Sequence, residues 1–589
     1  MSLTAIIHNA KDVVTSLPIL VTAVGPILLV PVAIYAFTTI SYHISLSGLE
    51  NARQKSKVVS PPLLPYSLPL LGNAFAFLSK TPGKFWRSLA GILSKHPAMS
   101  ILTVYMGGRK LHVLHSPTAV TSLFKARNVS RSGFNRDIIV KAMMLNKQDD
   151  KAIYGQGSSN VELFEHKQYE IYNKYLLATN AVTQLTHKFN EVLQRELAAY
   201  CDKINVPLQS NKDDEWHSIP MVSFLKEHMF TASTLALYGS KIFDFVPNLA
   251  DKYWHFDTGL LARLYGLPRY FYPDAYAGIE EYHAGIMKWI EAGNAHHDGL
   301  PPLDMEWEEW AGSAVVRARR HMYTEMGISV AGMASFDMGF MFGLSSNAIP
   351  CTNWLLCHLL SPSNSTLLAK VQTEVDAARL PGGKIDMPTL LAAPYLTSAF
   401  NETLRHYVDV LVTRELNTDM VIENHFLPAG DVIMAPIFLA HHDGQEWNTQ
   451  PSPYGDKRGV MPPENVWYGE RFLKIDEKTG KAALSTREAA GKFIPWGGGA
   501  QICPGRVFAK QEVLAAVATF LGRFEVRFEE FLESTGKDGK MGKGLGRDEK
   551  SGFPVVKKQY SGNGVVAIEG DLRIGVRMRA GDDEWAESA

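Results

Sequence analysis

One cysteine near the end of the chain lies in a glycine-rich stretch that could present it as a ligand. Residues 493–506 contain three consecutive glycines at 497–499, followed by Cys503. Glycine runs are costly in helices and strands, so we expect a loop whose backbone can lie against something bulky. A helix is predicted to follow, with Pro504 at its first position, so the positive helix end favours a Cys503 thiolate. Such a thiolate is the axial sulfur ligand that a heme iron takes.

Two other interpretations of this loop stay open. The first is a glycine loop around a buried structural cysteine. The second is a dinucleotide-binding loop, which needs a preceding strand, glycines spaced for a pyrophosphate and an acidic residue about 20 positions later. That arrangement is not evident around residues 497–505.

The loop resembles the heme-binding signature of the cytochrome P450 superfamily. That signature has an aromatic residue seven positions before the cysteine, a glycine four before, a basic residue two before and a glycine two after. Around Cys503, the implied iron ligand, these positions hold Trp496, Gly499, Gln501 and Gly505. Trp496 replaces the usual phenylalanine and can still shield the sulfur. Gln501 replaces the usual arginine or histidine, so it can hydrogen-bond a heme propionate but carries no charge.

Composition and charge exclude several other classes of protein. Hydrophobic residues make up 46% of the 589 residues, which is ample for a large core and argues against disorder. The net charge of −1 provides no global basic field for nucleic acid. Four cysteines without a Cys-x-x-Cys pair are neither a disulfide framework nor a zinc site, and they favour a reducing compartment.

The N-terminal region predicts a membrane anchor. Residues 17–40 are apolar and uncharged, and they are long enough to cross a bilayer as one helix. Residues 1–16 contain one lysine, whereas residues 53–57 contain three basic residues, so the positive-inside rule places the rest of the chain in the cytosol. A cleaved signal peptide is the alternative, but the apolar run is too long and lacks a strongly basic start. We therefore predict a luminal tail at 1–16, an anchor at 17–40 and an endoplasmic reticulum location.

The rest of the chain is predicted to form a hinge and one catalytic domain. Residues 41–72 include a proline-rich stretch that favours a stiff connector and resembles the hinge of microsomal P450s, although an ordinary loop would also be proline-rich. Residues 73–589 are the predicted heme-thiolate domain. The implied fold class is mainly α (α+β), the P450 helical prism with small β-sheets. Strands are expected at 101–114, and helices over most of 116–300.

Residues 306–360 predict two helices, of which the second carries candidate catalytic positions. Pro350 lacks an N–H, so the helix must open at the carbonyl of Ser346. In most of the superfamily an acid–threonine pair relays protons here, but these two places hold Asn347 and Ala348. The Asn-x-x-Pro pattern resembles the branch of sterol 7α-hydroxylase, sterol 12α-hydroxylase and prostacyclin synthase. An amide can position a water or a substrate oxygen but does not titrate near neutral pH. Alternatively, Asn347 only satisfies a backbone group.

Several charged residues are candidates for supporting a heme. Glu402 and Arg405 are three apart on one predicted helix face and can pair. The resemblance adds Arg471 and implies a buried triad that stabilises the heme-side core. Arg414 matches the family's strand arginine that reaches a propionate, with an exposed strand edge as the alternative. The family's tryptophan–arginine pair is missing from the N-terminal half, where the candidate substitutes are His166, Lys167 and Lys174.

Two later segments are predicted from local composition. The lysine- and glycine-rich residues 533–550 are predicted to be an exposed insertion, and residues 562–566 and 572–576 are predicted to pair as a closing hairpin. The aromatic residues 270–273 fit either a membrane-facing substrate entrance or a core-packing loop.

The resemblance implies an enzyme with heme b as its cofactor. It would be a monooxygenase that uses O2 and electrons from NADPH, delivered by an NADPH–cytochrome reductase, with cytochrome b5 as a further implied electron donor. The substrate would be lipophilic, such as a sterol, terpenoid or alkaloid-like secondary metabolite. A docking surface for the reductase is predicted at Lys492, Arg506 and Lys510. Two alternatives stay open: an isomerase or dehydratase of an oxygenated lipid that needs no reductase, and a non-enzymatic heme-binding sensor.

Overall fold

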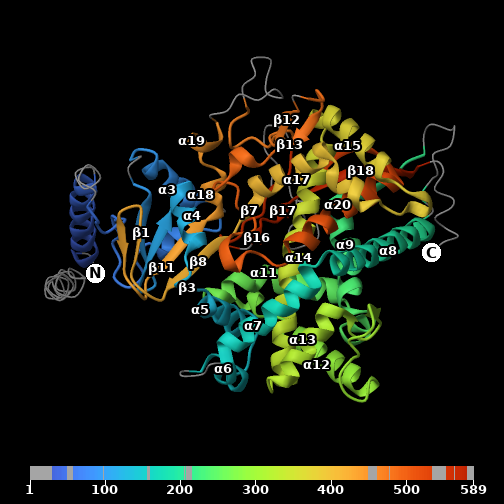
Figure 1. Ribbon diagram of the computed structural model, residues 1–589, viewed down its shortest axis with the longest axis horizontal. Helices are drawn as coiled ribbons and strands as arrows, with labels where there is room; N and C mark the ends of the chain where they lie inside the picture. Colours follow the sequence, from blue (N-terminus) through green and yellow to red (C-terminus); the bar gives the residue numbers. More distant parts are fainter. Residues whose placement is uncertain are drawn as a thin grey trace, which may run out of the picture. The chain divides into compact units, whose positions relative to one another are not determined.

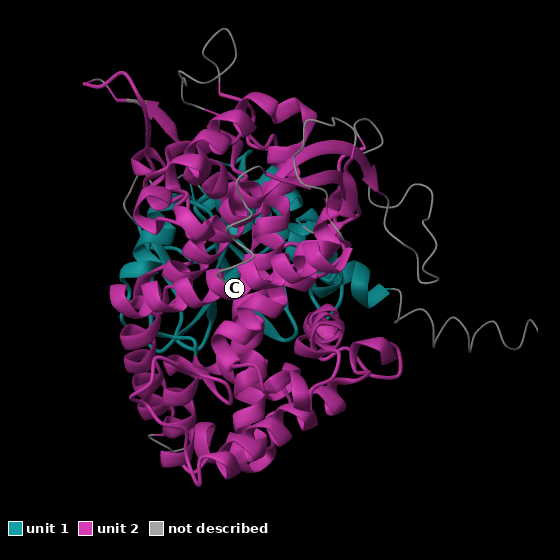
Figure 2. Ribbon diagram, turned by 90° about the vertical axis from the view of Figure 1, so that its right-hand side faces the viewer, with its two compact units in different colours: residues 1–79, 83–131, 411–440 teal, residues 80–82, 132–410, 441–589 magenta. Residues whose placement is uncertain are grey.

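The chain divides into two compact units, which are described separately (Figure 2). Unit 1 comprises residues 1–79, 83–131 and 411–440, and unit 2 comprises residues 80–82, 132–410 and 441–589. The computed structural model describes residues 29–49, 57–81, 83–96, 99–155, 160–204, 206, 215–448, 461–476, 478–532, 552–562 and 564–579. The fold is mainly helical with small sheets, as the sequence predicts (Figure 1).

Unit 1 is built on one five-stranded sheet. Its order is β1-β2-β11-β8-β3, and only the β2–β11 pair is parallel. The strands are β1 Ile101–Met106, β2 Arg109–Leu114, β3 Val129–Ser130, β8 Leu411–Leu416 and β11 Val432–Pro436. Gly107 and Gly108, with φ of 58° and 82°, make the turn between β1 and β2, since glycine adopts positive φ without strain. The predicted strands around this turn are confirmed.

Unit 1 also contains helices and the proline-rich hinge. Among its helices are α2 Ala74–Phe77, α3 Lys84–Leu93 and α4 Pro117–Lys125. The hinge runs beside β1, where Leu64 N–H donates to the Thr103 carbonyl over 2.8 Å and Thr103 N–H donates to the Pro62 carbonyl over 2.8 Å. The hinge is therefore tied to the sheet by backbone hydrogen bonds.

An apolar helix, Leu29–Leu49, precedes the hinge. It is the one helix among the described residues that is long and apolar enough to cross a membrane. Residues 17–28 of the predicted span lie outside the described residues. The helix continues past the predicted end at residue 40 as far as Leu49, because no proline interrupts it and the first glycine is Gly48.

Unit 2 contains the long helices, with α14 at their centre (Figure 1). The elements that position the site are α7 Asn160–Tyr172, α8 Thr179–Ile204, α9 Met221–Tyr238, α11 Leu249–Leu264, α12 Ile279–His296, α13 Ala314–Glu325, α14 Val330–Leu360, α15 Ser365–Ala378, α17 Pro394–Tyr407 and α20 Arg506–Arg523. Helix α14 contacts α9, α12, α17 and α20. The two helices predicted for 306–360 are α13 and α14, preceded by the short strands β5 Trp307–Glu308 and β6 Gly312–Ser313.

The predicted closing hairpin is wrong. Strand β18, Asp571–Met578, pairs with β14 Phe524–Leu532 and β4 His217–Pro220, whereas β16 Gly564–Val565 pairs with β7 Val408–Asp409. Alternating apolar residues predict that a segment is a strand but do not specify its partner, which here comes from distant parts of the chain. Residues 533–551, which include the predicted insertion, lie outside the described residues.

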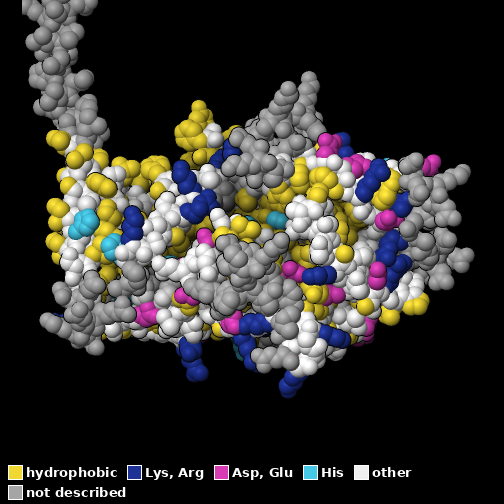
Figure 3. Space-filling model, turned by 90° about the horizontal axis from the view of Figure 1, so that it is seen from above, with side chains coloured by type: hydrophobic (Ala, Val, Ile, Leu, Met, Phe, Trp, Pro, Cys, Tyr) yellow, Lys and Arg dark blue, Asp and Glu magenta, His cyan; other side chains and the backbone are white. Residues whose placement is uncertain are grey.

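Charges of both signs are mixed on the face of the molecule seen in Figure 3. Lys and Arg side chains alternate with Asp and Glu across the face shown in Figure 3. This mixture agrees with the net charge of −1 and leaves no broad basic field on that face.

Candidate active site

The cysteine loop folds back on itself by backbone hydrogen bonds. Gly497 and Gly499 both have φ of 69°, which is the left-handed region that glycine tolerates best. The Cys503 N–H donates to the Trp496 carbonyl over 3.0 Å, and the Ile502 N–H donates to the Gly499 carbonyl over 3.2 Å. These bonds close the loop at the aromatic position and hold Cys503 at its end.

Cys503 differs from the other cysteines in its exposure. Cys201, Cys351 and Cys357 are buried, and burial raises the pKa of each thiol, whereas Cys503 is partly exposed. Helix α20 begins at Arg506, with Gly505 as its N-cap, so the prediction of Pro504 at the first helical position is wrong. Pro504 and Gly505 form the turn that leads into the helix. Cys503 still lies just before the N-terminus of an 18-residue helix, which favours a thiolate.

Gln501, two residues before Cys503, has a side-chain oxygen that could accept a hydrogen bond from a bound group. The buried Gln501 side-chain oxygen has no hydrogen-bond partner among the described residues. A buried polar atom of this kind normally has a partner, and an amide can turn either its oxygen or its nitrogen toward one. Arg506 is already engaged, since its guanidinium donates to the Cys503 carbonyl over 2.8 Å.

Helix α14 provides a second wall beside this loop. It packs on α20, the helix that follows Cys503. Phe340 on α14 stacks on Tyr172 at 5.9 Å between ring centroids. Burial raises the pKa of Tyr172, and the nearby Cys503 charge adds to this rise. A Cβ built on Gly343, one turn after Phe340, meets no atom within 4 Å. The thiol, the unsatisfied amide and this open helix face together fit a flat, polar-edged cofactor such as heme.

Among the three α14 candidates, Asn347 is the one on the open face. Ser346 and Ala348 are each 2% exposed. The Asn347 amide nitrogen donates to the Gly343 carbonyl over 3.2 Å, and its oxygen accepts the Val565 N–H at 3.1 Å. Asn347 therefore connects α14 to β16 by hydrogen bonds to two backbone groups. This is the structural role that the sequence analysis gives as the alternative for Asn347. Its second N–H and second lone pair can still contact a water or a ligand.

We expect Gly564→Ala to destabilise unit 2, because β16 packs so closely on Asn347 that position 564 has no room for a side chain. Gly564 has φ of 86°, and an added Cβ would lie 2.0 Å from the Asn347 side-chain oxygen. The free energy of unfolding should fall by roughly 1–3 kcal/mol more than for Gly327→Ala, measured by urea titration. Gly327 also has positive φ, 68°, but a Cβ there would meet nothing within 4 Å. The difference between the two variants therefore measures the steric clash with Asn347, separately from the cost of alanine at positive φ. Equal losses in the two variants would contradict this account.

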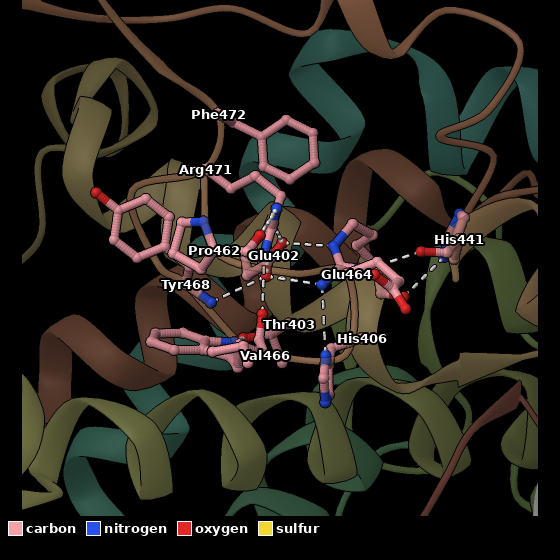
Figure 4. Close-up of polar contacts among 12 residues, drawn as sticks. Glu402, Thr403, His406, His441, Pro462, Glu464, Val466, Tyr468, Arg471 and Phe472 are labelled. Atoms are coloured by element: carbon pink, nitrogen blue, oxygen red, sulfur yellow. Dashed lines mark hydrogen bonds and ion pairs between the residues drawn. The ribbon is translucent and has the colours of Figure 1, made fainter. Parts of the chain in front are cut away.

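Glu402, Arg405 and Arg471 come together in one buried cluster (Figure 4). The Arg405 Nε donates to the Glu402 carboxylate at 2.7 Å, and the Arg471 Nε lies 3.0 Å from the same group. All three side chains are at most 2% exposed. The Tyr468 N–H also donates to Glu402, over 2.9 Å. The predicted triad therefore forms, with its carboxylate shared by two guanidiniums.

A histidine that the sequence analysis missed joins the triad to the cysteine loop. The Arg405 guanidinium donates to the His441 carbonyl over 2.7 Å, and the His441 Nδ1 lies 3.1 Å from the Arg405 carbonyl. The Ile494 N–H, at the start of the loop, donates to the His441 Nε2 over 3.0 Å. Burial lowers the pKa of His441 well below its usual value, so the ring is neutral and accepts this bond. No local sequence signal marks this residue.

Comparisons with known proteins agree with this geometry. The family model for cytochrome P450 matches residues 338–552, which include α14 from Met338 onward, the triad and the cysteine loop. The chain is 29% identical over 420 residues to the cytochrome P450 monooxygenase calL of Penicillium decumbens, covering 70% of this chain and 71% of that protein. The chain belongs to the cytochrome P450 family. It is a P450 monooxygenase, as the relatives with that name are.

Animal P450s are more distant relatives. The chain is 25% identical over 377 residues to cytochrome P450 7A1 of Oryctolagus cuniculus, covering 59% of this chain and 69% of that protein. It is 23% identical over 531 residues to the human 7-alpha-hydroxycholest-4-en-3-one 12-alpha-hydroxylase, covering 84% and 91%. The predicted resemblance to the sterol hydroxylase branch is thus confirmed at the level of relatives.

The predicted propionate contacts of this P450 stay predictions. Arg414 lies on β8 in unit 1 and is 5% exposed, so the exposed-edge alternative is wrong. Burial lowers its pKa to about 10, and the like charge of Arg131 contributes. The guanidiniums of Arg414 and Arg131 repel each other, and a bound anion would reduce this repulsion. No sequence signal marks Arg131 as a neighbour of Arg414.

The candidate substitutes in the N-terminal half have other partners. His166 pairs with Glu170 at 3.3 Å, and both side chains are more than 60% exposed. Lys167 pairs with Glu325 at 2.7 Å. Lys174 lies over the Tyr175 ring at 4.9 Å. These contacts, formed among residues of unit 2, give none of the three a clear role toward the cysteine loop.

The prediction of Lys492 as part of a docking surface is wrong. Lys492 is 8% exposed, donates to the Glu446 carbonyl and lies over the Trp447 ring at 5.0 Å. Burial lowers the pKa of Lys510. The sequence shows only that these residues are basic, whereas the local packing removes the charge of Lys492 from the surface.

Proposed function

We propose that this P450 is a membrane-anchored heme-thiolate monooxygenase that oxidises a lipophilic molecule with O2 and electrons supplied from NADPH by a reductase. The observation that carries this proposal is Cys503, partly exposed at the end of its glycine loop and just before α20. Heme b, bound at this cysteine, would supply the oxygen chemistry, and the thiolate would favour O–O cleavage. The enzyme would lie in the endoplasmic reticulum membrane.

The residues around the pocket would bind and orient the reactants. Cys503 would hold the iron, Trp496 would shield the sulfur and Gln501 would hydrogen-bond a propionate. Asn347 would position a water or substrate oxygen through its remaining donor and acceptor. The triad would hold the loop in place through His441 and Ile494.

Exposed apolar side chains support a membrane location and a lipophilic substrate. On the helix Leu29–Leu49, Leu29, Phe37 and Ile44 are 68%, 72% and 68% exposed. In unit 2, Tyr270 and Phe271, after α11, are 87% and 71% exposed. Large exposed apolar side chains mark membrane or ligand contacts when they cluster. The name of the human relative, 7-alpha-hydroxycholest-4-en-3-one 12-alpha-hydroxylase, favours a sterol-like substrate. The names of the fungal relatives print no substrate, so terpenoid and alkaloid-like metabolites stay further classes in this proposal.

The second candidate is a reductase-independent isomerase or dehydratase of an oxygenated lipid. It is favoured by the residues at 347 and 348, an amide and a methyl group, neither of which can donate a proton by titrating. Such chemistry rearranges oxygen that is already in the substrate.

We expect product formation by the purified protein to require NADPH, O2 and a P450 reductase together. The assay would follow NADPH consumption and product mass for sterol and terpenoid panels, with ¹⁸O₂ as the oxygen source. One ¹⁸O atom in the product would support the monooxygenase. Product formed anaerobically without the reductase would contradict it and support the second candidate.

A further inference from the structure

Helices α11 and α14 share a chain of polar side chains directly before Asn347. The Ser346 hydroxyl on α14 donates to Asp257 Oδ1 on α11 over 2.5 Å. The Tyr253 hydroxyl, one turn earlier on α11, lies 2.7 Å from the same Ser346 oxygen. Tyr253 and Ser346 are 0% and 2% exposed. Asp257 is partly exposed, so a half-buried carboxyl is connected to two buried hydroxyls.

Ser346 is also the residue at which the α14 backbone opens. Pro350 has no N–H, so the Ser346 carbonyl lacks its helical donor. Asn347, the next residue, lies on the open face beside Gly343 and Gly564. The freed Ser346 carbonyl can accept a hydrogen bond from a water, and Ser346 is adjacent to Asn347 in the helix. Ser346 thus lies between the carboxyl on α11 and Asn347 on the open face of α14.

The charged groups around Asp257 come from several elements. They are Lys226 on α9, Arg263 on α11 and Lys557 after β15 Val555–Val556. Burial raises the pKa of Asp257, while the Ser346 hydrogen bond and these three cations oppose the rise. Burial lowers the pKa of Lys226 to about 8. Asp257 therefore holds a proton more readily than an ordinary aspartate, and Lys226 releases one closer to neutral pH.

Solvent lies close to the outer end of this chain. Lys557 Nζ is 3.4 Å from the Thr258 hydroxyl, and Thr258 is exposed on α11. Arg263 is committed elsewhere, since it donates to the carbonyls of Phe256 and Ala275. Lys226 and Lys557 are thus the cations near Asp257 that other elements contribute.

We propose that Asp257, acting through the Ser346 hydroxyl, supplies protons to the pocket beside Asn347 in place of an acid–threonine pair. The Ser346 hydroxyl first turns from Asp257 toward a water beside Asn347; the protonated Asp257 carboxyl then gives its proton to Ser346 Oγ while Ser346 gives its hydroxyl proton to that water. The Asp257 carboxylate is then reprotonated from the Lys226 ammonium or from solvent. Only O–H and N–H bonds change. Asp257 is a positioning residue here, and the inference rests on the proposed monooxygenase function.

The test uses cumene hydroperoxide as a probe, because it needs neither reductase nor physiological substrate. Heterolytic O–O cleavage requires a proton for the leaving oxygen and gives cumyl alcohol, whereas homolytic cleavage gives acetophenone. We expect Asp257→Asn and Ser346→Ala each to lower the alcohol-to-ketone ratio by about 10-fold or more. The double variant should be no worse than either single variant, because the two residues act in series.

Matched variants separate proton supply from structure. Asp251→Asn removes an exposed carboxylate from the same helix, also near Lys226, and should leave the ratio unchanged. Ser346→Thr keeps the hydroxyl and should restore the ratio. In the unaltered protein the ratio should fall as pH rises through the Asp257 pKa, which lies above its usual value. In Asp257→Asn the profile should be flat over that range.

An infrared measurement supplies a readout that does not depend on turnover. The pH-dependent difference spectrum should contain a protonated-carboxyl band that persists above about pH 3.9, where an ordinary aspartate ionises. This band should be missing in Asp257→Asn and shifted in Ser346→Ala. Loss of the reduced carbon-monoxide band in the unaltered protein would refute the proposed function itself. A normal band with equal product ratios in Asp257→Asn and Asp251→Asn would refute only the proton supply.

Discussion

Replacing Cys503 by alanine is expected to abolish the thiolate absorption band of the reduced carbon-monoxide complex. The band reports sulfur ligation of the iron, and Cys503 is the one cysteine of the four that is not buried. Turnover should fall by at least about 100-fold, since removing even the outer partners of a metal ligand typically costs 10–100-fold. The measurement is the reduced carbon-monoxide difference spectrum, taken together with heme content.

Cys351→Ala is the matched control for this substitution. It also removes a thiol, but one that is 1% exposed on α14 and inert because burial raises its pKa. This variant should lose some stability through the small cavity it creates and keep the band. A thiolate band that survives in Cys503→Ala would overturn the ligand assignment.

Features encoded by neighbouring residues were predictable from the sequence. The spacing around Cys503 specifies the glycine loop because its bonds join residues only a few positions apart, such as Cys503 to Trp496. The turn at Gly107 and Gly108 follows from glycine's tolerance of positive φ. Glu402 and Arg405 pair because residues three apart share a helix face.

Features that depend on contacts between distant segments could not be predicted in this way. His441 joins Arg405 to Ile494, although the three come from separate parts of the chain. Asp257 and Ser346 are 89 residues apart, and neither residue type marks the other as a partner. The predicted terminal hairpin failed for the same reason, since β18 pairs with β14 and β4 rather than with the segment before it. Only the folded chain determines which of these groups meet.

Asn347, which departs from the family's acid–threonine pair, and the adjacent Ser346 both make hydrogen bonds to other elements of the structure. The Asn347 amide bonds β16, and the adjacent Ser346 reaches a carboxyl on α11. A titratable acid therefore lies one hydrogen bond from the residue before Asn347, but it comes from a different helix. The sequence of α14 contains no acid at positions 346–348. The packing of α11 on α14 nevertheless brings the Asp257 carboxyl into a hydrogen bond with Ser346 of that helix.

Glu402→Gln is expected to destabilise unit 2 strongly. The change keeps the shape of the side chain but removes the charge between the guanidiniums of Arg405 and Arg471, which are 0% and 2% exposed. Breaking a buried ion pair by removing one partner costs about 3–5 kcal/mol, because the remaining charge stays buried and unpaired. Urea titration followed by far-UV circular dichroism measures this loss.

Glu530→Gln is the control, because Glu530 pairs with Arg573 at 2.6 Å but the two side chains are 51% and 41% exposed. An exposed pair contributes about 0–1 kcal/mol. The structure also predicts an order of events in Glu402→Gln. Arg405 holds His441, and His441 holds the Ile494 N–H, so the thiolate band should disappear at lower urea than the helical signal. If Glu402→Gln and Glu530→Gln unfolded at the same urea concentration, with band and helix lost together, the triad would not be what holds the cysteine loop in place.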